Sequence, residues 1–345
     1  MAWQRARAAF CVMAVLAISG ILPPAASAQS ANFHPCNAQP ALPICQHGYG
    51  KRVAVKRWGA QPDPLDPDAA IRASLVTRDP AGEIEKLKST SILVQDAGTA
   101  EVLFARGQDE VRPIASITKL MTALVVLDAG LPLDEMVRID ASDDGVPSEL
   151  PSRLAVGASL SRSDLLHLAL MSSENSAAHA LGRTYPGGMR AFVDAMNARA
   201  QALGMTNSRF VEPVGLSNEN VSSAGDLARL LKAVAGQPLI RQFTTDPEDK
   251  LAGQVFHNTN MLVGRPGWTI LASKTGTTRE AGDCLVMMLE LDGRQLAMVL
   301  LNAQGMSGSR FGDAVRVRRV LSSRMTAKQE ASPLGLVPQK ALSSR

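Results

Sequence analysis

The sequence predicts an α+β fold, in which one antiparallel sheet is built from both ends of a folded unit and a helical lobe is inserted between them. Strand patterns joined by tight turns occur near each end of that unit, and apolar residues at helical spacing fill its middle. The composition agrees, because 46% of the 345 residues are hydrophobic and 20% are charged, as in a globular protein with a substantial core.

Residues 1–28 have the pattern of a secretory signal peptide. Arg5 and Arg7 are followed by an apolar stretch, Ala8–Leu22, and by the small-residue cleavage site Ala26-Ser27-Ala28. The apolar stretch is too short for a stable membrane span. We therefore expect cleavage, export to the periplasm and no stable membrane anchor in the mature protein; an uncleaved anchor is the alternative.

The charge balance does not favour nucleic acid as a partner. The chain carries a formal net charge of +4, and signal cleavage would remove two of its 36 basic residues and none of its 32 acidic ones. The mature protein would then be nearly neutral and would lack the basic footprint of a nucleic-acid-binding protein.

The four cysteines and five histidines do not predict a metal site. Cys11 lies in the signal peptide, and Cys284 lies in an apolar run typical of a small buried side chain. Cys36 and Cys45 could form a disulfide in an oxidising compartment, and whether they do is left open. Neither a Cys-x-x-Cys nor a His-Glu-x-x-His pattern occurs, so we expect no metal.

After the signal, residues 29–86 are rich in Pro, Ala, Asp and Gly and predict an extended, partly disordered arm. The folded unit is expected over residues 87–323, and a flexible tail over residues 324–345. The first two strands of the folded unit are predicted to form a hairpin of Ser91–Gln95 and Ala100–Phe104, joined by a polar turn.

Helices are expected in the middle of the unit. Pro113 is expected to open a helix that runs to Gly130, because proline is tolerated best at the first helical position. Apolar periodicity predicts three more, over Asp164–Leu181, Met189–Leu203 and Ala224–Ala235. The unit should close with a strand over Thr269–Ser273, a hairpin of Cys284–Leu291 and Gln295–Leu301 around Asp292-Gly293, and an amphipathic helix over Arg310–Ser323.

Ser116 and Lys119 are the first candidate catalytic pair. A spacing of three places both on one face of the helix predicted after Pro113. A serine hydroxyl is a weak nucleophile and needs a base within reach, which a lysine supplies if burial or a second cation lowers its pKa. No other lysine in the chain has a serine three residues before it.

Two further motifs follow in order. Ser173-Glu174-Asn175 comes after an apolar helical run, although such tripeptides are common, as Ser30-Ala31-Asn32 shows. Lys274-Thr275-Gly276 follows the predicted strand, where the glycine lets a substrate strand approach and the lysine offers charge to a carboxylate.

Ser-x-x-Lys, Ser-x-Asn and Lys-Thr-Gly in this order resemble the signature of the penicillin-binding protein and serine β-lactamase superfamily. More narrowly, the chain resembles the low-molecular-mass D-alanyl-D-alanine peptidases over residues 89–321, also at Phe210–Leu216 and Ala224–Leu227. The resemblance implies a β-lactamase/transpeptidase-like fold, peptidoglycan peptides as substrate, covalent binding of β-lactams, and no cofactor.

The resemblance also implies roles for single residues. Ser116 would form the acyl-enzyme, with Lys119 as the favoured base, although which lysine is the base is left open. Ser173 with Lys274 would return a proton to the leaving amine. The backbone N–H groups of Ser116 and Thr277 would form the oxyanion hole. The substrate would be bound by Asn175, Lys274, Thr275, Gly276 and Thr277.

Several activities of this superfamily compete. Few residues follow Gly276 beyond the predicted hairpin and helix, so we expect no further domain, as in the single-domain endopeptidases of the penicillin-binding protein 7 type. These cut the D-alanyl–diaminopimelate cross-link, and a D-alanyl-D-alanine carboxypeptidase is the alternative. A class A type β-lactamase would need Glu212 to activate water, but its surroundings match the peptidases better and predict a structural role. A non-catalytic binding module is disfavoured because the reactive side chains are all present.

Overall fold

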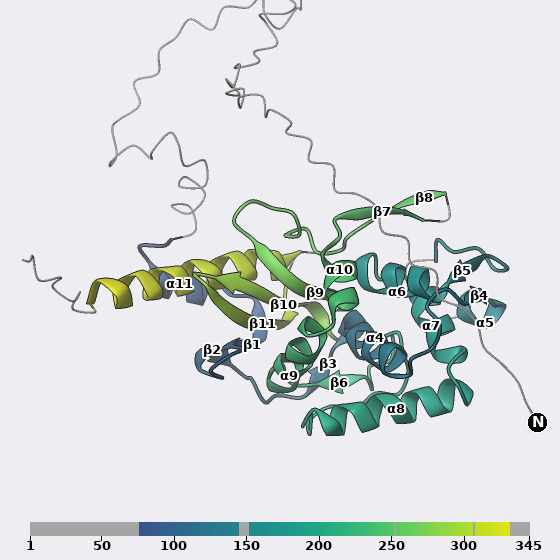
Figure 1. Ribbon diagram of the computed structural model, residues 1–345. Coiled ribbons are helices and arrows are strands. Elements are labelled where there is room, and N and C mark those ends of the chain that lie inside the picture. Colours follow the sequence, from purple (N-terminus) through teal and green to yellow (C-terminus); the bar gives the residue numbers. More distant parts are fainter. Residues whose placement is uncertain (1–75, 145–151, 252, 306–307, 332–345) are drawn as a thin grey trace, which may run out of the picture. The chain divides into compact units, whose positions relative to one another are not determined.

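The strands from the two ends of the folded unit form one sheet in the computed structural model, which describes residues 76–144, 152–251, 253–305 and 308–331. The sheet has the order β2-β1-β11-β10-β9, and every neighbouring pair is antiparallel (Figure 1). This confirms the predicted α+β class. The strands are β1 (Ser89–Asp96), β2 (Val102–Arg106), β9 (Thr269–Thr278), β10 (Gly282–Leu291) and β11 (Arg294–Ala303).

Both faces of this sheet are covered, so its central strands are apolar on both sides. Because successive side chains point to opposite faces, Leu285 and Met287 of β10 join one core cluster, and Val286 and Met288 join another. The first cluster is closed by α11 (Ser309–Ala331) and by Ile84 of α3 (Pro80–Glu85). The second is shared with α9 (Ala224–Ala235) and the helical lobe.

The helical lobe is built around α4 (Thr118–Asp128), which is buried from Thr118 to Val126. A helix that is apolar on all sides belongs in a core, and α4 contacts α6, α7, α8 and α9. The other helical elements of the lobe are η2 (Ala115–Ile117), α5 (Ala141–Asp144), α6 (Arg162–Met171), α7 (Asn175–Arg183), α8 (Gly188–Ala202) and α10 (Pro238–Thr245). Short strand pairs complete it: β3 (Arg112–Pro113) with β6 (Val221–Ser222), β4 (Met136–Arg138) with β5 (Ser159–Ser161), and β7 (Glu248–Leu251) with β8 (Gln254–His257).

Two predicted helices are wrong in their bounds. Pro113 does not open a helix but ends β3, where it pairs with Val221, and the α-helix begins only at Thr118. The helix expected over Asp164–Leu181 is interrupted between Met171 and Asn175, so it forms two helices, α6 and α7. In both places long-range contacts override the local pattern.

The ends of the folded unit also differ from the expectation. α3 lies within the expected arm, yet it is helical and packs on α11, so ordered structure begins before residue 87. β9 continues past Ser273 to Thr278, and α11 continues past Ser323 to Ala331. The expected signal peptide, Cys11, Cys36 and Cys45 lie outside the described residues.

Cys284 and the helices can be compared with the expectations directly. Cys284 is a free, fully buried thiol, and its burial raises its pKa to about 11. Within the part of the chain that the structure describes, no helix is long and apolar enough to cross a membrane.

Candidate active site

Ser116 lies in the three-residue 3-10 helix η2, which leads directly into the buried helix α4. The turn is held by two glycines. Gly215 has φ +92°, and a side chain there would place its Cβ only 2.0 Å from the Ala115 carbonyl oxygen. A Cβ at Gly276 of β9 would lie 3.0 Å from the Ser116 backbone nitrogen. Gly215 therefore requires glycine, and Gly276 leaves little room for a side chain.

Lys119 contacts Ser116 directly, as the spacing predicted. Its Nζ donates hydrogen bonds to Ser116 Oγ at 2.8 Å, to Asn175 Oδ1 at 2.9 Å and to the Val214 carbonyl oxygen at 2.9 Å. The side chain is fully buried, and this burial lowers its pKa to about 7, although the charges of Glu212 and Glu174 oppose the shift. An amine with this pKa can accept a proton near neutral pH.

Ser173 lies in the break between α6 and α7. Its φ of +63° is in the left-handed region, which is unusual for a serine. The backbone N–H of Glu174 and the hydroxyl of Ser172 both bond the Leu168 carbonyl, which closes the end of α6. The break points the Ser173 hydroxyl at Lys274, whose Nζ donates to it at 2.8 Å.

Lys274 reaches the site from the opposite side, from strand β9. It pairs in register with Val286, whose side chain belongs to the core that the sheet shares with the lobe. Its pKa is lowered well below the ordinary value, first by burial and then by the nearby charges of Lys119 and Arg310. The charge of Lys119 thus disfavours a charge on Lys274.

The rest of β9 meets a second hydrogen-bond network. Thr275 Oγ1 bonds Thr259 Oγ1 at 2.6 Å, and Thr277 Oγ1 bonds Asp283 Oδ1 at 3.0 Å. Arg310 of α11 donates to the same Asp283 oxygen at 2.9 Å, to the Gly276 carbonyl at 3.1 Å and to the Thr277 hydroxyl. The arginine is therefore held at the edge of β9.

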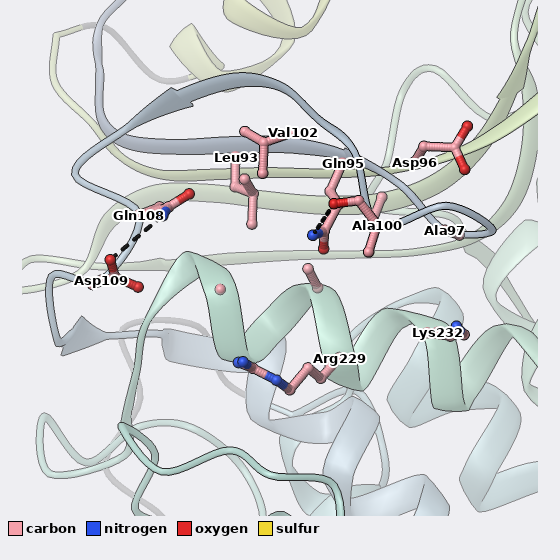
Figure 2. A pocket seen from close by; sticks show the side chains of 13 residues that line it. Leu93, Gln95, Asp96, Ala97, Ala100, Val102, Gln108, Asp109, Arg229 and Lys232 are labelled. Carbon is pink, nitrogen blue, oxygen red and sulfur yellow. Dashed lines mark hydrogen bonds between the residues drawn. The ribbon is translucent and has the colours of Figure 1, made fainter.

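These side chains line a groove of about 870 Å³. Of the eight predicted site residues, it exposes Ser116, Ser173, Asn175, Thr275, Gly276 and Thr277, while the two lysines lie buried beneath them. The structure thus brings together all eight, although the oxyanion role of the Ser116 and Thr277 N–H groups stays a prediction. A smaller hollow of about 360 Å³ between β1, β2 and α9 contains none of them (Figure 2).

The contacts of Glu212 agree with the structural role that the sequence predicts for it. Its carboxylate accepts hydrogen bonds from the backbone N–H groups of Val214, Gly215, Leu216 and Ser217, at 2.6 to 3.3 Å. The Asn220 amide adds another at 2.8 Å. A carboxylate with so many donors is saturated, and it shapes the turn that carries Val214 to Lys119.

Arg153, Thr259 and Arg310 are among the groove-lining residues that sequence reasoning did not predict as site residues. Arg310 begins the closing helix, where its pattern indicates only an amphipathic surface. Arg153 and Thr259 belong to no motif, and only the folded chain brings them to Ser173. No signal in the sequence singles them out.

Known proteins are similar to this chain in sequence. A family model described as D-alanyl-D-alanine carboxypeptidase matches residues 77–305. A D-alanyl-D-alanine endopeptidase of Pseudomonas aeruginosa is 50% identical over 245 residues, covering 69% of this chain and 79% of that protein. A D-alanyl-D-alanine endopeptidase of Escherichia coli is 44% identical over 284 residues, covering 81% of this chain and 90% of that protein.

Solved structures agree with the sequence relatives. Penicillin-binding protein D2 from Listeria monocytogenes, in its ampicillin-bound form, matches with a TM-score of 0.61 and 30% identity, over 68% of this chain and 97% of that one. A D-alanyl-D-alanine carboxypeptidase from Mycobacterium tuberculosis matches with a TM-score of 0.62 and 28% identity, over 68% of this chain and 90% of that one. The resemblance read from the three motifs is confirmed, and the chain belongs to the D-alanyl-D-alanine carboxypeptidase family.

Proposed function

We propose that this protein is an active-site serine D,D-peptidase that hydrolyses D-alanyl bonds of peptidoglycan through an acyl-enzyme. The observation that carries the proposal is the 2.8 Å hydrogen bond between the buried Lys119 amine and the Ser116 hydroxyl, because burial lowers the lysine pKa to about 7. A neutral amine at this distance can take the serine proton as the hydroxyl attacks.

The first half of the reaction releases the amine. Ser116 Oγ bonds to the D-alanyl carbonyl carbon while its proton passes to Lys119, and the N–H groups of Ser116 and Thr277 stabilise the oxyanion. As the C–N bond breaks, the leaving nitrogen takes a proton from the Ser173 hydroxyl, which Lys274 contacts at 2.8 Å. Lys274 replenishes the Ser173 proton and regains one from Lys119 through the site.

The second half restores the enzyme. Water attacks the ester, its proton returns by way of Lys119, and Ser116 leaves as the free hydroxyl. The net change is one peptide bond and one water converted into a carboxylic acid and an amine. No metal or organic cofactor takes part in this scheme.

Substrate binding follows from the charges around β9. The edge of β9 lies along the groove, so a substrate peptide in extended form can pair with it. The carboxylate next to the scissile bond would meet Arg310, Thr275 and Thr277, with Asn175 on the substrate amide. Arg310 is held for this by Asp283.

Between the two D,D-peptidase activities, we propose the endopeptidase that cuts D-alanyl–diaminopimelate cross-links. The support is that the Pseudomonas and Escherichia relatives, at 50% and 44% identity, are both endopeptidases by name. A D-alanyl-D-alanine carboxypeptidase is the second candidate, favoured by the description of the family. We propose the periplasm as its location.

Brief mixing of the mature protein with benzylpenicillin, followed by intact mass measurement, tests the serine. We expect a persistent adduct on the peptide that contains Ser116, and no adduct with Ser116→Ala, whose fold should be intact. An adduct that survives in Ser116→Ala would refute the nucleophile. Consumption of penicillin without an adduct would indicate a β-lactamase.

Purified cross-linked and uncross-linked wall peptides separate the two peptidase activities. We expect conversion of cross-linked dimers to monomers. Release of terminal D-alanine alone would make the protein a carboxypeptidase.

A further inference from the structure

Arg153 lies at the rim of the groove and is not used by the mechanism above. Its Nε donates to Glu174 Oε1 at 2.7 Å, and its guanidinium lies over the ring of Phe256 in β8, 4.1 Å from the ring centroid. Its side chain is 41% exposed, and among the described residues its Nη atoms have no hydrogen-bond partner. Stacking and pairing therefore hold the guanidinium in one place while half of its fork stays free.

The position of Arg153 relative to the scissile bond follows from its neighbours. Glu174, which holds Arg153, is adjacent in sequence to Ser173, the proposed proton donor to the leaving amine. Thr259, just after β8, bonds the Met171 carbonyl with its N–H and Thr275 with its hydroxyl. Ser173, Thr259 and Arg153 thus form one continuous wall.

The remaining residues of the groove would receive the part of the substrate that becomes the acyl group. Asn175 and the turn carrying Val214 both contact Lys119, and Leu216 of that turn lines the groove. In the proposed mechanism the amine departs beside Ser173, so the peptide attached to that amine would run along the wall with Arg153.

The free charge on this wall is positive. Both oxygens of Glu174 are engaged, one by Arg153 and one by the Ser152 hydroxyl at 3.1 Å. Arg153 lines the groove, and both oxygens of the carboxylate beside it are already engaged by other donors. A planar guanidinium fork is suited to binding a carboxylate through two parallel hydrogen bonds.

We propose that Arg153, on its Phe256 platform, is a binding site for a carboxylate of the leaving peptide strand, beyond the carboxylate that adjoins the scissile amide. The inference rests on the proposed peptidase function and gives it a source of specificity. A free terminal D-alanine has no group that reaches this site, whereas the second strand of a cross-linked dimer carries further carboxylates. Arg153 then favours cross-links over single strands.

The test compares two cross-linked dimers. One has its natural leaving strand; in the other, every carboxylate of the leaving strand is amidated except the one next to the scissile bond. We expect wild type to cleave the natural dimer with a kcat/KM about tenfold higher, as for one charge-assisted hydrogen-bond pair. In the Arg153→Gln/Glu174→Gln variant, which leaves no buried carboxylate unpaired, this preference should disappear.

Arg209→Gln is the matched control, since Arg209 also pairs with a glutamate, Glu219 at 3.2 Å, but does not line the groove. It should keep the tenfold preference. If wild type cleaves both dimers equally, or the double variant slows both to the same degree and keeps the preference, the Arg153 site is wrong and the peptidase function stands. If wild type cleaves neither dimer, the Arg153 site and the endopeptidase activity both fail, and penicillin labelling of Ser116 decides whether the serine peptidase function stands.

Discussion

Lys119 is the residue on which the proposed chemistry depends. Since burial lowers its pKa to about 7, it is largely protonated below that pH and cannot accept the Ser116 proton. We predict that the second-order rate of acylation by benzylpenicillin rises with pH and levels off above a midpoint near pH 7. Stopped-flow mixing across the range from about pH 5 to 9 measures this.

Substitution of the same lysine checks the assignment. Lys119→Met should reduce acylation by about 10³-fold, within the range for loss of a general base, while Ser116 stays in place. A rate that is independent of pH in wild type, or a Lys119→Met enzyme that acylates normally, would move the base function to Lys274.

At the scale of elements, the turn from Glu212 to Ser217 holds the proposed catalytic pair, Ser116 and Lys119, in place. Replacing Glu212 with Gln leaves only one acceptor oxygen for donors that now share two. We predict that Glu212→Gln lowers the free energy of unfolding by about 1–3 kcal/mol, measured by denaturant titration. The slow release of bound penicillin should not collapse; if it does, Glu212 activates water and the β-lactamase interpretation returns.

The same turn offers a sharper comparison between two glycines. Gly215 and Gly204 both have positive φ, at +92° and +70°. A Cβ at Gly215 would clash with the Ala115 carbonyl, whereas at Gly204 the nearest heavy atom is 3.9 Å away. We predict that Gly204→Ala lowers the free energy of unfolding only by the backbone strain, about 1–2 kcal/mol. Gly215→Ala should carry the same strain and should in addition abolish acylation, because it displaces Ser116. Equal penicillin labelling of the two variants would disprove the clamp.

The elements also show how far local sequence signals reach. α9 has the predicted bounds, Ala224–Ala235, because Ser223 caps it locally by accepting from the Asp226 N–H. The hairpin of β10 and β11 forms around Asp292-Gly293 as predicted. The helix predicted to open at Pro113 was wrong because Pro113 pairs in a strand with Val221, which is remote in sequence.

Some features of the candidate site could likewise be predicted from the sequence, and others could not. The three motifs predicted the groups that the structure brings together around Ser116, since serine and lysine at fixed spacing are themselves the groups proposed to react. The left-handed backbone of Ser173 and the location of Arg153 and Arg310 depend on contacts with distant segments. Such contacts leave no periodic pattern in the chain.

At the scale of the whole molecule, a buried carboxylate joins the first strand to the last helix. Asp313 of α11 accepts hydrogen bonds from the Lys88 and Ser89 N–H groups and from the Ser89 hydroxyl, at 2.6 to 3.0 Å. We predict that Asp313→Ala lowers the free energy of unfolding by about 3 kcal/mol, because several buried donors lose their partner. Asp134→Asn, at an exposed carboxylate, should change it by less than about 0.5 kcal/mol.

The contact of Asp313 with Lys88 and Ser89 also holds one side of the groove in place, since the groove residue Arg310 lies in the same helix as Asp313. Chemical denaturation of Asp313→Ala should therefore remain a single transition, with penicillin labelling lost at the same denaturant concentration as the helical signal. Loss of labelling well before the helical signal would mean that α11 detaches alone.

The two glycines packed around Ser116 restrict how such an enzyme can evolve under antibiotic pressure. Any side chain at Gly215 or Gly276 would press on the backbone that carries the nucleophile. Resistance by substitution of either glycine is thus closed, because the enzyme would lose its own reaction along with the drug. Escape variants should instead collect at the outer rim of the groove, where inhibitor and natural peptide make different contacts.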